Sequence, residues 1–132
     1  MIKKTHTIFY VDDQESSTNF YSKLLNQKPT LYVPGMTEFS LTNNSIFGLM
    51  PASGIKKLLK EKIEQPNKIN NQPRAELYLI VDNIDEYINR AKKMNVKLLD
   101  ELKDRDWGHR VIYYEDIDGY IIAFAETQDE TK

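Results

Sequence analysis

The chain has 132 residues, of which 40% are hydrophobic and 29% charged, a composition typical of one soluble globular domain. It contains no cysteine, so disulfides, thiolate metal sites and cysteine nucleophiles are excluded, and we expect a cytoplasmic protein. The formal charge is −2, with lysines interleaved among acids, and no apolar run approaches the ~20 residues of a membrane helix. Nucleic acid and membrane are therefore not expected among its partners.

The first half of the chain shows one helix pattern among several short strand patterns. Residues 6–11 alternate as a half-buried strand does, and Asp12-Asp13 offers an N-cap for a helix with apolar positions at 20, 21, 24 and 25. Strand-like segments follow at 31–33, 38–41 and 46–50, separated by the turn signals Pro34-Gly35 and Asn43-Asn44.

The second half repeats this order of elements. A strand pattern begins at Glu76, Asn83 followed by Glu86 predicts a capped helix, and strands are expected at 96–99, 109–114 and 120–125, the last after an Asp118-Gly119 turn. A shift of 70 residues places Glu76 on His6, and a shift of 75 places Ile121 on Ile46. Identity is low, so a chance similarity is the alternative, but the shared order favours a duplication.

The predicted architecture is α+β, with two βαβββ modules over residues 5–50 and 75–126 in one domain. A polar linker over 51–74, containing one short amphipathic turn, joins them. Strand alternation assigns an apolar set to the helix side: Phe9, Val11, Phe47, Leu49, Leu77, Leu79, Val81, Ile122 and Phe124. The opposite side mixes apolar, aromatic and ionisable residues. We predict a curved mixed sheet around a small-molecule cavity, with the helices outside; packing against a partner chain has nearly equal weight.

Two segments resemble a known superfamily. HTIFYVDDQESSTNFYSKLL (6–25) is similar to the opening of the vicinal-oxygen-chelate superfamily, which includes glyoxalase I, bleomycin-resistance proteins, fosfomycin-resistance enzymes and extradiol dioxygenases. RDWGHRVIYYEDIDGYIIAFAE (105–126) resembles its closing segment, with Ile117 in place of the usual proline. The resemblance covers residues 5–126 and implies the paired βαβββ fold. It does not specify a reaction, because this fold hosts unrelated chemistries.

The resemblance also implies where a metal would be held. The ligand positions of metal-using members fall on His6, Gly48, Glu76 and Ala123, and only His6 and Glu76 carry donor atoms. A divalent ion on nitrogen and oxygen ligands usually takes at least three protein side chains, so we predict no metal and no other cofactor. His6 and Glu76 remain the candidates for acid/base catalysis, although we favour a hydrogen bond between them with only a structural role.

A second candidate cluster surrounds Trp107. Trp107 could stack on a flat ligand while Arg110 or His109 contacts an anionic group. In the alternative, Trp107 covers a sheet edge and Arg110 pairs with Glu115 or Asp116.

The sequence favours a small-molecule-binding protein of the glyoxalase/bleomycin-resistance type, with a degenerate metal site, a small hydrophobic or aromatic ligand, and a homodimeric state. Two alternatives stay open: a glyoxalase-like lyase or isomerase, and a dimeric interaction domain without a ligand. The predicted ligand-binding residues are His6, Ile8, Tyr10, Gly48, Met50, Glu76, Tyr78, Trp107, Arg110 and Ala123.

Overall fold

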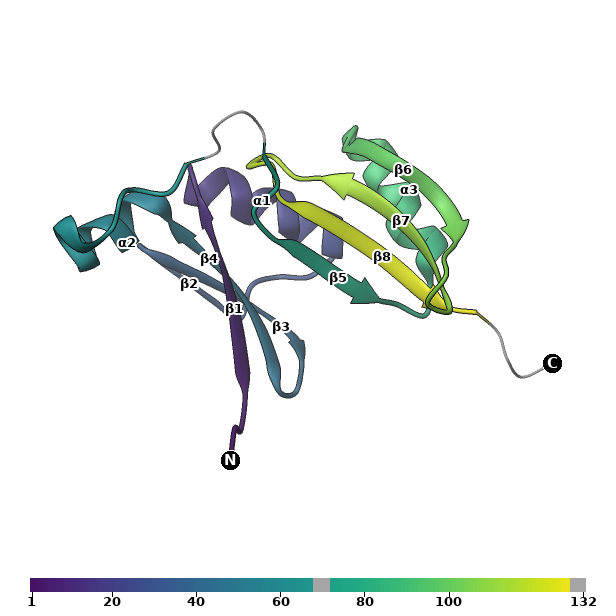
Figure 1. The fold of residues 1–132 in the computed structure, drawn as a ribbon, viewed down its shortest axis with the longest axis horizontal. Helices are drawn as coiled ribbons and strands as arrows, with labels where there is room; N and C mark the ends of the chain where they lie inside the picture. The colour runs from purple at the N-terminus through teal and green to yellow at the C-terminus, as the bar shows by residue number, and fades with distance from the viewer. Residues whose placement is uncertain (68–71, 129–132) are drawn as a thin grey trace. The chain divides into compact units, whose positions relative to one another are not determined.

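The computed structural model describes residues 1–67 and 72–128 (Figure 1). The chain forms two compact units, Met1–Ile69 and Asn70–Lys132, each with its own four-stranded sheet. The predicted linker begins in the first unit, and its residues 68–71 lie outside the described part. None of the helices in the described residues is long and apolar enough to cross a membrane.

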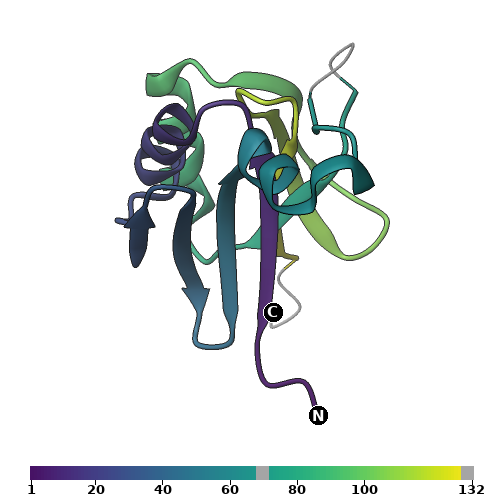
Figure 2. The same cartoon turned by 90° about the vertical axis from the view of Figure 1, so that its left-hand side faces the viewer.

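The first unit contains a mixed sheet in the order β1-β4-β3-β2, seen strand beside strand in Figure 2. β1 runs parallel to β4, and the other two pairings are antiparallel. Its elements are β1 (Thr5–Val11), α1 (Gln14–Leu25), β2 (Leu31–Val33), β3 (Met36–Thr42), β4 (Ser45–Pro51), α2 (Ala52–Leu59) and the 3-10 turn η1 (Lys60–Lys62).

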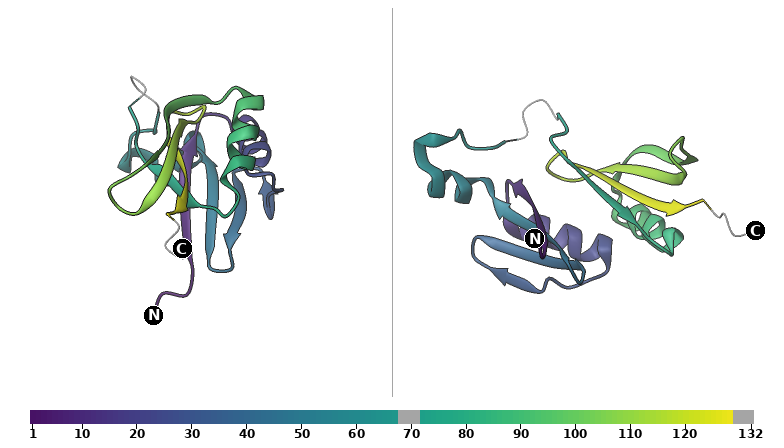
Figure 3. Two further views of the ribbon diagram at one scale, coloured as in Figure 1. Left: turned by 90° about the vertical axis from the view of Figure 1, so that its right-hand side faces the viewer. Right: turned by 60° about the horizontal axis from the view of Figure 1, so that its bottom comes forward.

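The second unit has the same topology, in the order β5-β8-β7-β6, with α3 packed on one side of the sheet (Figure 3). β5 is parallel to β8, and β6, β7 and β8 pair antiparallel. Its elements are β5 (Glu76–Ile80), α3 (Ile84–Met94), β6 (Lys97–Asp104), β7 (His109–Glu115) and β8 (Ile121–Thr127). The α+β class and the paired βαβββ modules are therefore confirmed.

Strand pairing also confirms the two sequence offsets residue by residue. His6 lies opposite Ile46 across β1 and β4, and Glu76 lies opposite Ile121 across β5 and β8. Gly48 and Ala123 consequently occupy equivalent places in the two sheets, each beside the first strand of its own unit.

Each unit buries the strand face that its helix covers. In the first unit, the Phe47 ring packs edge-on against Phe9 at 5.0 Å and against Tyr21 of α1 at 4.9 Å. In the second, the Phe124 ring lies 4.8 Å from Tyr87 of α3. The predicted helix-side set is buried apart from Leu79 and Val81, which are half-buried.

One of the two predicted helix caps is present and the other is absent, and the predicted turn after residue 50 is a longer helix. Asp13 caps α1 as expected, because its Oδ2 accepts from the Ser16 N–H at 2.9 Å. Asn83 makes no such cap; its side-chain amide donates to Glu86 Oε2 at 2.9 Å. The short turn expected after residue 50 is the longer helix α2, because Ala52 and Ile55 are both buried and hold two turns of helix in place.

The strand expected at 96–99 extends to Asp104. Its side chains are mostly exposed and polar, so alternation alone did not mark it, and its pairing with β7 supplies the regularity. The predicted Asp118-Gly119 turn is present: Asp116 Oδ1 accepts from the N–H groups of Asp118 (2.8 Å) and Tyr120 (2.9 Å), and Gly119 has a φ of 89°.

Candidate functional site

The face of the first sheet opposite α1 carries five of the predicted residues: His6, Ile8, Tyr10, Gly48 and Met50. Strand pairing adds Glu38, which lies opposite Gly48 on β3. Its Oε2 is 3.6 Å from His6 Nδ1, with the two side chains 24% and 43% exposed. The partner of His6 within this unit is therefore Glu38, whose register the sequence did not fix.

The face of the second sheet opposite α3 has a small apolar floor with aromatic sides. Val111, Ala123 and Ala125 are fully buried, and Tyr78 and Tyr113 pack against them. Tyr78 and Tyr113 both lie opposite Ala123 in register, one on each side. Glu76 lies on the same face, two residue pairs further along, and is exposed.

Three polar groups meet at one end of this face. Trp107 Nε1 donates to the Tyr78 hydroxyl at 2.8 Å, and the same hydroxyl lies 2.6 Å from His109 Nδ1. The Trp107 side chain is nevertheless 56% exposed, so its ring is held by one edge. The structure thus brings together three residues that the sequence analysis singled out: Tyr78, Trp107 and His109.

Arg105 holds the hairpin loop that carries Trp107, and sequence reasoning missed this role. Its guanidinium donates to the Glu101 carbonyl (3.0 Å) and the Val111 carbonyl (2.7 Å), and it lies 5.1 Å from the centre of the Tyr113 ring. Its Nη1 also donates to Asp100 Oδ2 at 2.9 Å, while Nε is buried with no hydrogen-bond partner in the described residues. Nothing local in the sequence distinguishes this arginine from Arg110.

Two groups beside Arg105 have shifted pKa values. The hydrogen bond from Arg105, with a second from Lys103, holds the pKa of the Asp100 carboxyl below its ordinary value. Burial, with a smaller contribution from the negative charge of Glu76, raises the pKa of the Tyr113 hydroxyl. Tyr113 is therefore a protonated hydroxyl throughout the physiological range.

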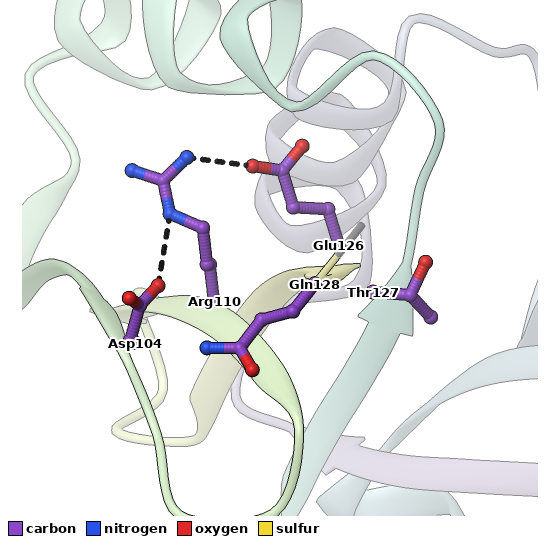
Figure 4. Close-up of a pocket in the computed structure, with 5 residues that line it drawn as sticks. All are labelled: Asp104, Arg110, Glu126, Thr127 and Gln128. Carbon is purple, nitrogen blue, oxygen red and sulfur yellow. Dashed lines mark hydrogen bonds and ion pairs between the residues drawn. The ribbon is translucent and has the colours of Figure 1, made fainter. Parts of the chain in front are cut away.

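Arg110 lies on the other face of the second sheet, away from Tyr78 and Trp107. Its guanidinium pairs with Asp104 (3.3 Å) and Glu126 (3.1 Å) in a shallow pocket of about 520 Å³, completed by Thr127 and Gln128 (Figure 4). The prediction that Arg110 pairs with Glu115 or Asp116 is wrong. Arg110 lies directly opposite Glu126, and Glu115 pairs with Lys97.

Comparison with known proteins identifies the family. The profile of the glyoxalase-like domain family matches residues 4–129, nearly the whole chain. The chain belongs to this family. No curated protein sequence matches it.

Solved structures share the glyoxalase-like fold at low sequence identity. A glyoxalase/bleomycin resistance protein/dioxygenase from Nocardioides superimposes with a TM-score of 0.77 at 18% identity, covering 97% of this chain and 85% of that one. A glyoxalase-related enzyme from Fulvimarina pelagi gives 0.76 at 16% identity, covering 96% and 89%. A lactoylglutathione lyase from Agrobacterium tumefaciens gives 0.68 at 16% identity, covering 92% and 91%.

Two of the four positions that the resemblance assigns to metal ligands, Gly48 and Ala123, have apolar surroundings. A Cβ on Gly48 would lie 3.1 Å from Ile8 Cγ1 and 3.5 Å from Met36 Sδ, so apolar atoms crowd that position. Ala123 is fully buried beside Tyr78 and Tyr113. The described residues contain no group of three side chains able to hold a metal ion.

Proposed function

We propose that this chain is a small-molecule-binding protein that takes a planar aromatic ligand on the face of the second sheet opposite α3. The observation that carries the proposal is the Trp107–Tyr78–His109 cluster: an indole ring, 56% exposed, anchored by its N–H to a tyrosine hydroxyl beside an apolar floor. Membership of the glyoxalase-like family supports a protein of glyoxalase or bleomycin-resistance type.

The anchoring of Trp107 favours stacking. An exposed indole usually loses rotamer freedom on binding, which opposes association, whereas the bond to Tyr78 restricts this ring beforehand. Ring stacking contributes about 0.5–1.5 kcal/mol beyond the burial of apolar area. The polar groups at the end of the face then orient the ligand.

Because Trp107 is the single tryptophan of the chain, its emission reports on this site alone. We expect 4-nitrobenzyl alcohol, a non-fluorescent quencher, to quench it saturably with a Kd on the order of 1 mM. Calorimetry should show that Trp107→Ala abolishes this binding and that Trp107→Phe retains most of it. As a control, Leu58→Ala changes an exposed apolar side chain of α2 and should leave the Kd unchanged. Undiminished binding to Trp107→Ala, or the absence of saturable quenching, would contradict the proposal.

We also propose that the protein works without the divalent metal of its metal-using relatives. Two of the four ligand positions have no donor atom, and the crowding at Gly48 and the burial of Ala123 support the same view. Protein purified without a histidine tag should contain far less than one equivalent of Zn, Ni, Fe or Mn by elemental analysis. A content near one equivalent, bound through His6, Glu38 or Glu76 and lost in their alanine variants, would overturn this.

A further inference from the structure

Donor and acceptor can be assigned for both hydrogen bonds of the Trp107–Tyr78–His109 cluster. An indole N–H can only donate, so the Tyr78 oxygen accepts from Trp107. A phenol is a stronger donor than acceptor, and accepting one hydrogen bond polarises its O–H further, so its proton goes to His109 Nδ1 at 2.6 Å. Neutral His109 then carries its own proton on Nε2, for which no described residue is an acceptor.

From this geometry, and resting on the proposed function, we infer that His109, oriented by Tyr78, recognises an oxygen anion on the aromatic ligand. The ligand class is a planar aromatic acid, whose ring stacks on Trp107 while its carboxylate or phenolate oxygen accepts from His109 Nε2.

The surrounding charges leave this end of the face free for an anion. Arg105 is paired with Asp100 on the hairpin, and Thr127, opposite His109 on β8, is uncharged. The charges of Arg110, Asp104 and Glu126 belong to the other face. Tyr113 on β7 is a neutral hydroxyl.

Two further carboxylates lie on this face, Glu76 and Glu115, and both are at its opposite end; Glu115 is paired with Lys97. Both are level with Ile121 of β8, whereas His109 is level with Thr127. These six residues of strand span about 20 Å at ~3.3 Å per residue. Repulsion between Glu76 and a bound anion is thus screened at physiological ionic strength, where the Debye length is about 8 Å.

Three probes of similar shape but different charge test whether the site prefers an anion: 4-nitrobenzoate, 4-nitrobenzyl alcohol and 4-nitrobenzylamine. Quenching of Trp107 emission is titrated with each probe at neutral pH. We expect 4-nitrobenzoate to bind most tightly of the three, roughly five- to tenfold more tightly than the neutral alcohol.

Variants test whether the preference for the acid probe comes from the Trp107–Tyr78–His109 cluster. His109→Phe removes the Nε2 donor, so the preference for the acid should vanish while the alcohol still binds. Tyr78→Phe should reduce the preference for the acid. Arg110→Gln removes a positive charge from the other face and should change neither. Equal binding of all three probes, a preference for the amine, or loss of the acid preference in Arg110→Gln would overturn the inference and leave the proposed function standing. Quenching by none of the probes would overturn both.

Discussion

Ala123→Glu, which restores a donor at one of the family's metal positions, is expected to lower the free energy of unfolding by more than about 3 kcal/mol at neutral pH. Ala123 is fully buried with Tyr78 and Tyr113 on either side, so the new carboxylate would lose its water without gaining a cationic partner. Urea unfolding followed by the emission of Trp107 in the same unit measures the change.

The matched control is Ala123→Met, which adds a side chain of similar length without a charge. Overpacking alone should cost about 1–3 kcal/mol, so the excess of the Glu variant over the Met variant isolates the buried charge. Burial raises the pKa of an introduced carboxyl in the folded state. The excess should therefore be absent below the ordinary pKa of glutamate, about 4.3, and grow as the pH rises above it. A Glu variant as stable as the Met variant, and further stabilised by a divalent ion, would show that position 123 still accepts a metal ligand.

Most of the fold could be predicted from local patterns in the sequence. Alternation, the Asp13 cap and the Asp118-Gly119 turn are each readable within a few residues. The repeat offsets align β1 with β5 and β4 with β8, and the two parallel strand pairs have the equivalent registers that these offsets require. The position of Glu38 was not readable in this way. The pairing of β3 with β4 shifts by one residue between Ser40 and Thr42, and such a bulge leaves no mark in the alternation.

The residues of the candidate site could also be predicted only in part from local patterns. Tyr78 was placed on the correct face by alternation, and Trp107 was singled out as a large aromatic residue before a strand. Their hydrogen bond depends on the path of the hairpin from Arg105 to Gly108, where Gly108 adopts a φ of 89°. Arg110 was grouped with Trp107 because it is near in sequence, yet it directly follows His109 in β7, and consecutive strand residues point to opposite faces.

Arg105→Ala is expected to lower the free energy of unfolding by about 2–4 kcal/mol and to weaken the binding of the nitrophenyl probes. The Arg105 side chain is only 14% exposed, and its removal leaves the Glu101 and Val111 carbonyls without their guanidinium donor and uncovers the Tyr113 ring. The hairpin then loses the group that fixes Trp107 beside Tyr78. The two readouts are urea unfolding and probe titration by calorimetry.

Arg110→Ala provides the matched control, since it removes the same side chain from a position where both ion pairs are solvent-accessible. Arg110 is 46% exposed, and exposed pairs contribute at most about 1 kcal/mol, so its loss should change stability little and probe binding not at all. Equal destabilisation by the two variants would contradict the role assigned to Arg105.

The titration of Asp100 gives an independent readout of the same contact. Arg105 is the first cause of the lowered pKa of Asp100, so carboxyl chemical shifts measured by NMR should show that pKa rising toward its ordinary value in Arg105→Ala, with the contribution of Lys103 retained. A lowered pKa in the folded state stabilises the protein above the unfolded pKa, and this contribution is lost as the pH falls through the folded value. The stability difference between the wild type and Arg105→Ala should therefore be larger at neutral pH and narrow in acid, whereas an unchanged Asp100 titration would mean that Arg105 and Asp100 are not paired in solution.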